Sequence, residues 1–458
     1  MQTSLWRLVL IGILGASWAG VAFGKDTSST REPLSAPSNR LMYNSDGNHI
    51  FHDERRPADL RARWHSRGDA LVEPLTVEKL LQHVDEVSGT GVGTFLLCPI
   101  SYQVVLYKSA IERRLGDGAT EEQLKGGSLS IRETIAALRN FDALGVDPFE
   151  LLVKRIREKG MSPVVTWRLQ QAHVIYGGEK SIAQSPFWEA HPECRLKGSG
   201  GGGEKDAALD FANPAVQARK VALIREFVVK YGMDGCQLDF QRFPLFFVKG
   251  KEAEEISLMN GFMRSMRKML DEEGAKLNRH LTMGVRIPEN PERCRALGLD
   301  PATWVNEGLV DSVVVSTFLF QNAEARFTIP HYPIDIPAFR ALFKKPVPIY
   351  GAIQALYGVI DRRPVQFRLM PDDYRKEALK LWGQGADGIE LFNMFMMRAK
   401  GAFKGTRAEP PFFLLKELGS PDLIGRVRSP EEAAWMKLYG GADSVPEPYR
   451  AQINTGTN

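Results

Sequence analysis

The sequence has little of several things that would place it in a specialised class of protein. Its 458 residues hold only four cysteines and eight histidines, too few for a disulfide scaffold in a chain of this length. No Cys-x-x-Cys motif and no His-rich tract indicates a metal centre. The 59 basic and 55 acidic side chains leave a weak, scattered net charge of +4, which indicates no nucleic-acid surface. We therefore expect no metal, no cofactor and no nucleic-acid partner.

The amino terminus carries the only long apolar run. A short start with one positive charge precedes the stretch Leu8–Val21, and small residues at Ala22-Phe23-Gly24 suit a cleavage site. This pattern predicts a signal peptide over residues 1–24, followed by a polar lead-in over 25–39. An uncleaved anchor is the alternative, but the stretch is short and diluted by Gly and Ala. We expect a secreted or periplasmic protein without membrane attachment after cleavage.

Two of the cysteines leave a question open. Cys98 and Cys236 fall in apolar, strand-like runs, where a buried free thiol is the simplest interpretation. Cys194 and Cys294 lie in loop-like segments and could pair in an oxidising compartment, although the sequence does not show that they meet.

Apolar runs rich in β-branched residues recur along the chain, and amphipathic stretches of helical period lie between them. Examples of the helical stretches are Ile131–Leu138, Val216–Tyr231, Glu254–Glu273 and Asp372–Gly383. The predicted strands are Leu41–Asp46, Thr94–Ile100, Pro163–Leu169, Gly235–Phe240, Leu281–Ile287, Ser312–Phe318, Val347–Ile353 and Gly388–Asn393.

Eight parallel strands close a barrel, so the predicted fold is α/β, a (β/α)₈ TIM barrel over residues 40–418. A short C-terminal extension over 419–458 follows it. An open doubly wound sheet is the rival architecture, but no Gly-rich phosphate loop follows a strand directly.

The fourth predicted strand is the most informative. It reads Met233-Asp234-Gly235-Cys236-Gln237-Leu238-Asp239-Phe240-Gln241-Arg242-Phe243-Pro244. Strand alternation places Gln237, Asp239 and Gln241 on one face, and the apolar residues between them on the other. The polar face should point into the barrel, where active sites sit at the carboxyl ends of the strands. Asp239 is therefore the first catalytic candidate, the alternative being a structural acid paired with Arg242.

This strand carries a resemblance to known proteins. Leu209-Asp210-Phe211-Ala212-Asn213-Pro214, the helical stretch after it, and the pattern Asp-Gly-x-x-x-Asp-x-x-Arg-Phe-Pro over 234–244 resemble glycoside-hydrolase-like barrel proteins. The start Tyr43-Asn44-Ser45-Asp46-Gly47 is also similar to that of exported bacterial proteins of undescribed function. The strand is similar to the chitinase signature Asp-Gly-x-Asp-x-Asp-x-Glu too, but Gln237 and Gln241 replace the middle Asp and the Glu that acts as general acid.

The resemblance implies a glycosidase, and glycosidic hydrolysis needs two carboxyl groups. Two residues compete to be the partner of Asp239. Glu390 lies within the eighth strand, which faces the fourth across a barrel, whereas Glu289 follows the adjacent fifth strand. We prefer Glu390 because its strand fixes its position, while Glu289 could equally be a surface acid.

Polar and aromatic side chains at other strand ends suit a sugar, because sugars present hydroxyls to polar groups and flat faces to aromatic rings. The candidate binding residues are Tyr43, Asn44, Asp46, Trp167, Arg168, His173, Gln237, Gln241, Arg242, Arg286 and Asn393. Three arginines in this set would suit an anionic sugar, unless each pairs with Asp46, Asp239 or Glu390.

The sequence thus predicts a glycoside hydrolase that acts on a polysaccharide or oligosaccharide. The alternative is a catalytically silent carbohydrate-binding barrel, which the two glutamines in acid positions favour.

Overall fold

The computed structural model describes residues 40–45, 47–52, 75–126, 129–171, 181–197, 208–317, 327–328, 334–354, 357–360, 363–366, 369–398, 408–426 and 428–440, all within the compact unit Glu32–Asn458. Eight parallel strands form a closed barrel with the order β1-β13-β10-β8-β7-β6-β5-β2. They are β1 (Leu41–Ser45), β2 (Val92–Leu97), β5 (Ser162–Arg168), β6 (Gly235–Asp239), β7 (Thr282–Ile287), β8 (Ser312–Val315), β10 (Ile349–Gln354) and β13 (Gly388–Phe392). The (β/α)₈ fold is therefore confirmed, and each predicted strand matches one barrel strand to within a few residues.

Strand alternation separates two apolar layers. The barrel interior holds one small cluster, and the space between strands and helices holds a much larger one that includes Cys236 and Leu238 of β6. The interior cluster consists of Met42, Leu96, Val164, Val314, Tyr350 and Ala352. The interior residues nearer the carboxyl ends of the strands are polar. The polar side chains therefore lie at the end of the barrel where active sites are expected.

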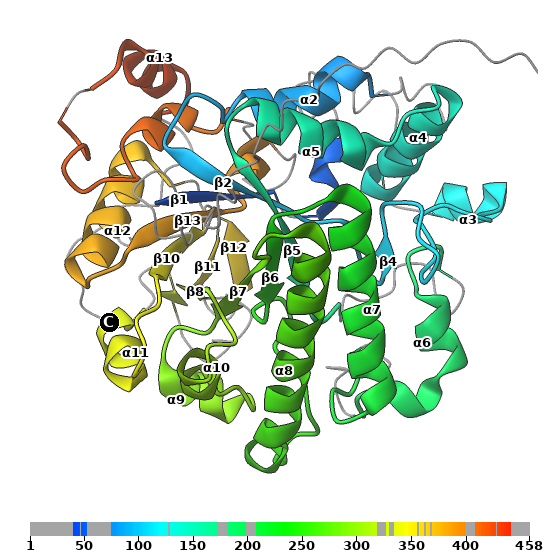
Figure 1. Cartoon of the computed structure of the whole chain (residues 1–458). Helices are drawn as coiled ribbons and strands as arrows, with labels where there is room; N and C mark the ends of the chain where they lie inside the picture. The colour runs from blue at the N-terminus through cyan, green and yellow to red at the C-terminus, as the bar shows by residue number, and fades with distance from the viewer. Residues whose placement is uncertain are drawn as a thin grey trace, which may run out of the picture. The chain divides into compact units, whose positions relative to one another are not determined.

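Helices cover the outside of the barrel (Figure 1). They are α2 (Val77–Asp85), α4 (Leu129–Ala143), α5 (Pro148–Glu158), α7 (Pro214–Tyr231), α8 (Glu252–Leu277), α9 (Pro291–Ala296), α10 (Pro301–Asn306), α11 (Ile336–Leu342) and α12 (Pro371–Gly383). The helix before β6 shows how sequence sets its bounds. The Asn213 side chain accepts a hydrogen bond from the Ala215 backbone N–H, and Gly232 ends the helix at a φ of 61°.

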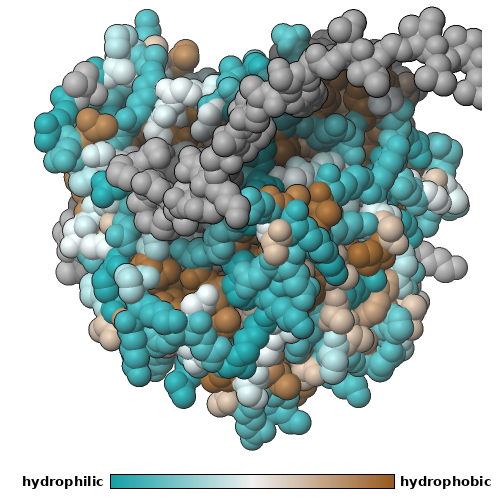
Figure 2. Space-filling view, in the orientation of Figure 1, coloured by the Kyte–Doolittle hydropathy of each residue, from teal (hydrophilic) through white to brown (hydrophobic). Residues whose placement is uncertain are grey.

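Shorter elements lie in the connections. They are η2 (Gly47–Phe51), β3 (Ile100–Ser101), β4 (Val104–Val105), α3 (Glu121–Gly126), α6 (Pro186–Ala190), η4 (Pro192–Cys194), β9 (Phe327–Thr328), β11 (Tyr357–Ile360), β12 (Arg363–Gln366), η6 (Met394–Arg398), η7 (Phe412–Lys416) and α13 (Pro430–Tyr439). Figure 2 shows that hydrophilic residues predominate on the visible face. Within the described residues, no helix combines the length and apolar character needed to cross a membrane.

Acids at the amino ends of the strands are structural. The Asp311 carboxylate accepts a hydrogen bond from the Met283 backbone N–H at 2.7 Å, and that of Asp387 accepts one from Ile349 at 2.8 Å. Asp234 is buried and binds Arg157 and Arg279 at 2.9 and 2.8 Å. The Asp-Gly turns before β6 and β13 therefore begin with acids that tie neighbouring elements together.

The four cysteines are free and buried. The pairing of Cys194 with Cys294, which the sequence left open, is not formed. Each of these thiols instead lies against a polar group: the Cys194 sulfur accepts a hydrogen bond from Asn213, and Cys294 lies 3.9 Å from the Pro288 carbonyl.

One arginine joins the segment after the barrel to the helical layer. Arg375 of α12 is buried and binds Glu417 at 2.7 Å and Glu432 of α13 at 2.8 Å. Both carboxylates are largely buried. Glu432 also binds the exposed Arg428 at 2.5 Å, whereas Glu417 has no ion pair other than that with Arg375 within the described residues.

Replacing Arg375 with methionine should therefore destabilise the protein by about 3–5 kcal/mol, because it leaves two carboxylates without their buried partner. Denaturant unfolding measures this. The matched control is Arg264→Met, which removes an exposed pair with Glu307 and should cost only about 0–1 kcal/mol. Equal effects of the two substitutions would contradict the structural role of Arg375.

Candidate active site

Polar side chains from opposite walls of the barrel meet in its interior. β6 and β13 lie four places apart in the closed order, and the Gln237 side-chain N–H₂ donates to the Glu390 carboxylate at 2.6 Å. This bond spans the barrel, so both side chains point inward as the alternation predicts.

Glu390 is fully buried and has three polar neighbours. Besides Gln237, the Asn44 side chain donates to it at 3.2 Å, and Nε of Arg286 lies 3.7 Å from the same carboxylate. Burial raises the pKa of Glu390 to about 7, and Arg286 and Gln237 offset only part of this rise. Glu390 therefore retains a proton in a pH range where an ordinary glutamate has lost it.

Asp239 is held from two sides. Its carboxylate accepts a hydrogen bond from Nη1 of Arg286 at 3.0 Å and another from the backbone N–H of Gln241 at 2.9 Å. Only 1% of its surface is exposed. These two donors fix the position of the Asp239 carboxyl in the barrel interior.

Arg286 lies between the two acids. It is fully buried, and its Nη2 donates to the Ser316 hydroxyl at 2.8 Å. Its guanidinium carbon lies 3.9 Å from the centre of the Phe392 ring, which supports the charge from one side. One guanidinium thus contacts both acids.

Arg286 is joined to both acids, but the two contacts differ. Its Nη1 lies 3.0 Å from Asp239, whereas its Nε lies 3.7 Å from Glu390. Burial of Glu390 outweighs the longer contact, so the pKa of Glu390 rises. The interior thus holds a carboxyl group that titrates near neutral pH.

The two glutamines have defined partners. Gln237 accepts a hydrogen bond from Thr166 at 2.9 Å while it donates to Glu390. Gln241 is fully buried and donates to the Ser316 backbone carbonyl at 2.6 Å. These amides orient the acids and the neighbouring strand end.

Three other amides at the same end of the barrel have side-chain polar atoms without a hydrogen bond within the described part of the chain. The Asn44 side-chain oxygen and both side-chain polar atoms of Gln354 and Asn393 are buried without a hydrogen bond. Asn44 and Gln354 flank Phe392 in the register of β1, β13 and β10. Unpartnered buried amides are costly, so this rim favours a ligand that offers both donors and acceptors.

Several sequence candidates lie elsewhere. Tyr43 packs in the outer layer against Phe95 and Phe412, with ring centres 5.5 and 6.0 Å away. Trp167 also belongs to the outer layer. Strand alternation points both rings away from the barrel interior. Neither ring therefore lies where we expected a platform for stacking against a sugar.

Glu289 does not join the acid cluster. It is half-buried beside Arg293, and burial raises its pKa. No contact joins it to Asp239 or Arg286 among the described residues. Of the two candidate partners for Asp239, the structure brings Glu390 alone to the shared arginine.

The remaining candidates are placed as follows. Arg168 is buried, pairs with Asp239 in the strand register, and lies close to Gly47. Arg242 is half-buried, with its guanidinium 5.9 Å from the Phe243 ring centre. Asp46 and His173 lie outside the described residues.

Four contributors escaped the sequence analysis: Thr166, Ser316, Gln354 and Phe392. All four follow from alternation along predicted strands, continued one residue beyond the predicted end for Gln354. None of the four side chains carries a charge, so none stood out in the sequence as a candidate for acid/base chemistry.

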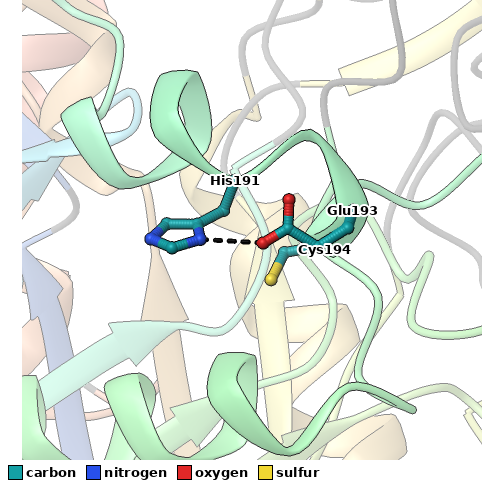
Figure 3. A group of neighbouring side chains, drawn as sticks. All are labelled: His191, Glu193 and Cys194. Atoms are coloured by element: carbon teal, nitrogen blue, oxygen red, sulfur yellow. Dashed lines mark hydrogen bonds and ion pairs between the residues drawn. The ribbon is translucent and has the colours of Figure 1, made fainter.

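One group in the described residues could hold a metal ion by composition, namely His191, Glu193 and Cys194 (Figure 3). The group also satisfies itself without an ion. Nδ1 of His191 lies 2.8 Å from the Glu193 carboxylate, and burial raises the pKa of the Cys194 thiol, which disfavours the thiolate that a metal needs.

Comparisons with known proteins give only distant structural matches. No protein-family model matches the chain, and no curated protein does so. Among solved structures, a chitinase from Chromobacterium violaceum matches with a TM-score of 0.41 at 10% identity, over 83% of this chain and 98% of that one. A glycoside hydrolase family 18 N-acetylglucosaminidase from Paenibacillus barengoltzii matches with a TM-score of 0.36 at 13% identity, over 57% and 85% of the two chains. Likeness at this level assigns no role to a side chain.

The raised pKa predicts how Glu390 affects stability. Between its ordinary pKa of 4.5 and about 7, the folded protein holds a proton that the unfolded chain has released. Stability from this group is therefore fully present below about pH 4.5 and is lost as the pH rises towards 7, by up to about 3 kcal/mol. Glu390→Gln removes this loss. The melting temperature of the variant minus that of the wild type should therefore increase as the pH rises from about 5 to 8.

Thermal unfolding across that pH range checks the prediction. The control is Glu307→Gln, because its exposed partner Arg264 lowers the pKa of Glu307. That carboxyl is therefore ionised in both the folded and the unfolded chain from about pH 5 to 8, and the melting-temperature difference of this variant should not change with pH. A melting-temperature difference for Glu390→Gln that does not change with pH would contradict a raised pKa.

Proposed function

We propose that the protein is a glycoside hydrolase in which Glu390 and Asp239 are the two carboxyl groups of the reaction. The observation that carries this proposal is the placement of two acids from opposite strands on one buried guanidinium, that of Arg286. Glycosidic hydrolysis uses one protonated and one ionised carboxyl group.

In this mechanism Glu390 donates its proton to the departing glycosidic oxygen. Its burial supports the role, because a general acid works best with a pKa near the working pH. The Asp239 carboxylate, held by Arg286, supports the positive charge that develops on the sugar, as a nucleophile or as a base that activates water.

The rim amides support a hydroxyl-rich substrate. Asn44, Gln354 and Asn393 offer unpartnered oxygens and N–H groups at the carboxyl end of the barrel. A sugar hydroxyl both donates and accepts, and so satisfies such groups. Arg286, which the sequence analysis considered for an anionic sugar, is committed to the two acids, so we propose a neutral oligosaccharide or polysaccharide.

A second function is favoured by a specific observation. In the position where the chitinase signature has its general acid, Gln241 donates to the Ser316 backbone carbonyl. A neutral amide bound in this way transfers no proton. A catalytically silent carbohydrate-binding barrel would use the same rim amides without turnover.

The test is hydrolysis of a panel of neutral and anionic oligosaccharides, with release of reducing ends as the measurement. Glu390→Gln and Asp239→Asn should each lower kcat by about 10²–10⁴, because acid/base groups contribute on that order. Asp311→Asn, which changes a structural acid at the opposite end of the barrel, is the control and should leave the kcat of the folded protein unchanged.

Binding measurements separate the two functions. If wild type and both variants bind an oligosaccharide equally well and the wild type releases no reducing ends, the silent barrel is correct. If no glycan in the panel binds or reacts, both functions are contradicted.

A further inference from the structure

A second concave site lies outside the barrel, between the outer face of β5 and helix α7. The β3–β4 hairpin and helix α6 form its other walls, in the region at the right of Figure 1. The empty space at this site is about 530 Å³ when the open solvent at its mouth is included. Its walls include Tyr102, Trp167, Gln171, Trp188, Arg219 and Lys220.

This outer pocket is separate from the acid cluster. Trp167 lines it from the outer face of β5, whereas the Thr166 side chain beside it points inward to Gln237. The wall of the barrel therefore stands between the two sites, and a ligand in one does not contact the other.

Buried polar atoms without partners line this pocket. The indole N–H of Trp167 has no hydrogen bond although the residue is only 1% exposed. Both side-chain polar atoms of Gln171 are equally unpartnered, and this residue is 7% exposed. Each such group costs free energy unless something in the pocket binds it. The set comprises two kinds of N–H donor and one acceptor.

The pocket also carries one uncompensated positive charge. Arg219 binds Glu112 at 2.7 Å, and the same carboxylate oxygen accepts from Ser185 at 2.6 Å, so this pair is neutral and satisfied. Lys220 is half-buried beside it and forms no ion pair or hydrogen bond within the described residues. Burial lowers the pKa of Lys220 to about 8, so its ammonium is still charged at neutral pH.

We propose that this outer pocket binds a small hydroxycarboxylate of monosaccharide size, such as a sugar acid. The ammonium of Lys220 and the indole N–H of Trp167 suit a carboxylate, and the Gln171 oxygen needs a donor such as a hydroxyl. The half-buried ring of Tyr102 suits the apolar face of a sugar ring. The inference does not depend on the proposed hydrolase activity.

The test is calorimetric titration of the full chain with D-glucuronate, with D-glucose as the neutral probe. Glucuronate should bind and glucose should bind at least about tenfold more weakly, since one charged interaction is lost. Lys220→Met should weaken glucuronate binding by about tenfold or more. Lys154→Met, the same change at a residue 75% exposed on α5, is the matched control and should have no effect.

Further variants make the outcome decisive. Trp167→Phe keeps a ring but loses the N–H, and should also weaken binding. Glu390→Gln should bind glucuronate as the wild type does, because it changes the barrel interior alone. The proposal is overturned if glucuronate does not bind, if Lys220→Met binds as well as Lys154→Met, or if Glu390→Gln is the variant that loses binding.

Binding should also weaken as the pH rises through about 8, where Lys220 loses its proton. The groups facing it are Arg219 and Glu112, which form an ion pair with each other. Affinity that is constant from about pH 7 to 10 would likewise overturn a role for the Lys220 ammonium.

Discussion

The contact of Arg286 with both Asp239 and Glu390 is the constraint on which the barrel interior depends. Arg286 is the one cation that ion pairs join to both acids within the described residues, and the other side chains that bind Glu390 are the neutral amides of Gln237 and Asn44. Burial of Glu390 outweighs these contacts and raises its pKa to about 7. Glu390 therefore keeps a proton up to near neutral pH.

This constraint explains how acids at the two ends of the barrel differ. At the amino ends, Asp311 and Asp387 accept hydrogen bonds from backbone N–H groups, and Asp234 binds two arginines, so all three stabilise the closure of the barrel. Inside the barrel, Glu390 has lost its solvent and gains only partial compensation, so its pKa moves towards neutrality. The same residue types thus serve structure at one end and are suited to chemistry at the other.

The fold could be read from the sequence because alternating strands and helices carry strong local patterns. The strand bounds followed from apolar runs, and the inward direction of Gln237, Asp239 and Glu390 followed from period-two alternation. The role of Arg286 was partly accessible, since pairing with the acids was one of its two expected uses. Its contact with both acids depends on how the barrel closes, and the spacing of residues along the sequence does not show this.

Other features were missed, some of them because no local sequence pattern carries them. Tyr43 and Trp167 were taken as sugar platforms because aromatic residues suit sugars, yet the strand alternation that placed Asp239 inward also places these rings outward. The outer pocket is assembled from segments far apart in the chain, including the β3–β4 hairpin and α7, and no local pattern brings them together. The unpartnered amides of Asn44, Gln354 and Asn393 become visible only when all hydrogen bonds are counted in three dimensions.

The central claim is that burial keeps Glu390 protonated up to about neutral pH, and infrared spectroscopy of the carboxyl groups tests it most directly. The protonated-carboxyl band of the wild type should persist to about pH 7 and fade around that value. The band should be absent from Glu390→Gln. In Asp239→Asn it should fade at a lower pH than in the wild type, because the charge of Asp239 is one cause of the raised pKa. A wild-type band that is already gone near pH 5, or one that persists in Glu390→Gln, would contradict the account.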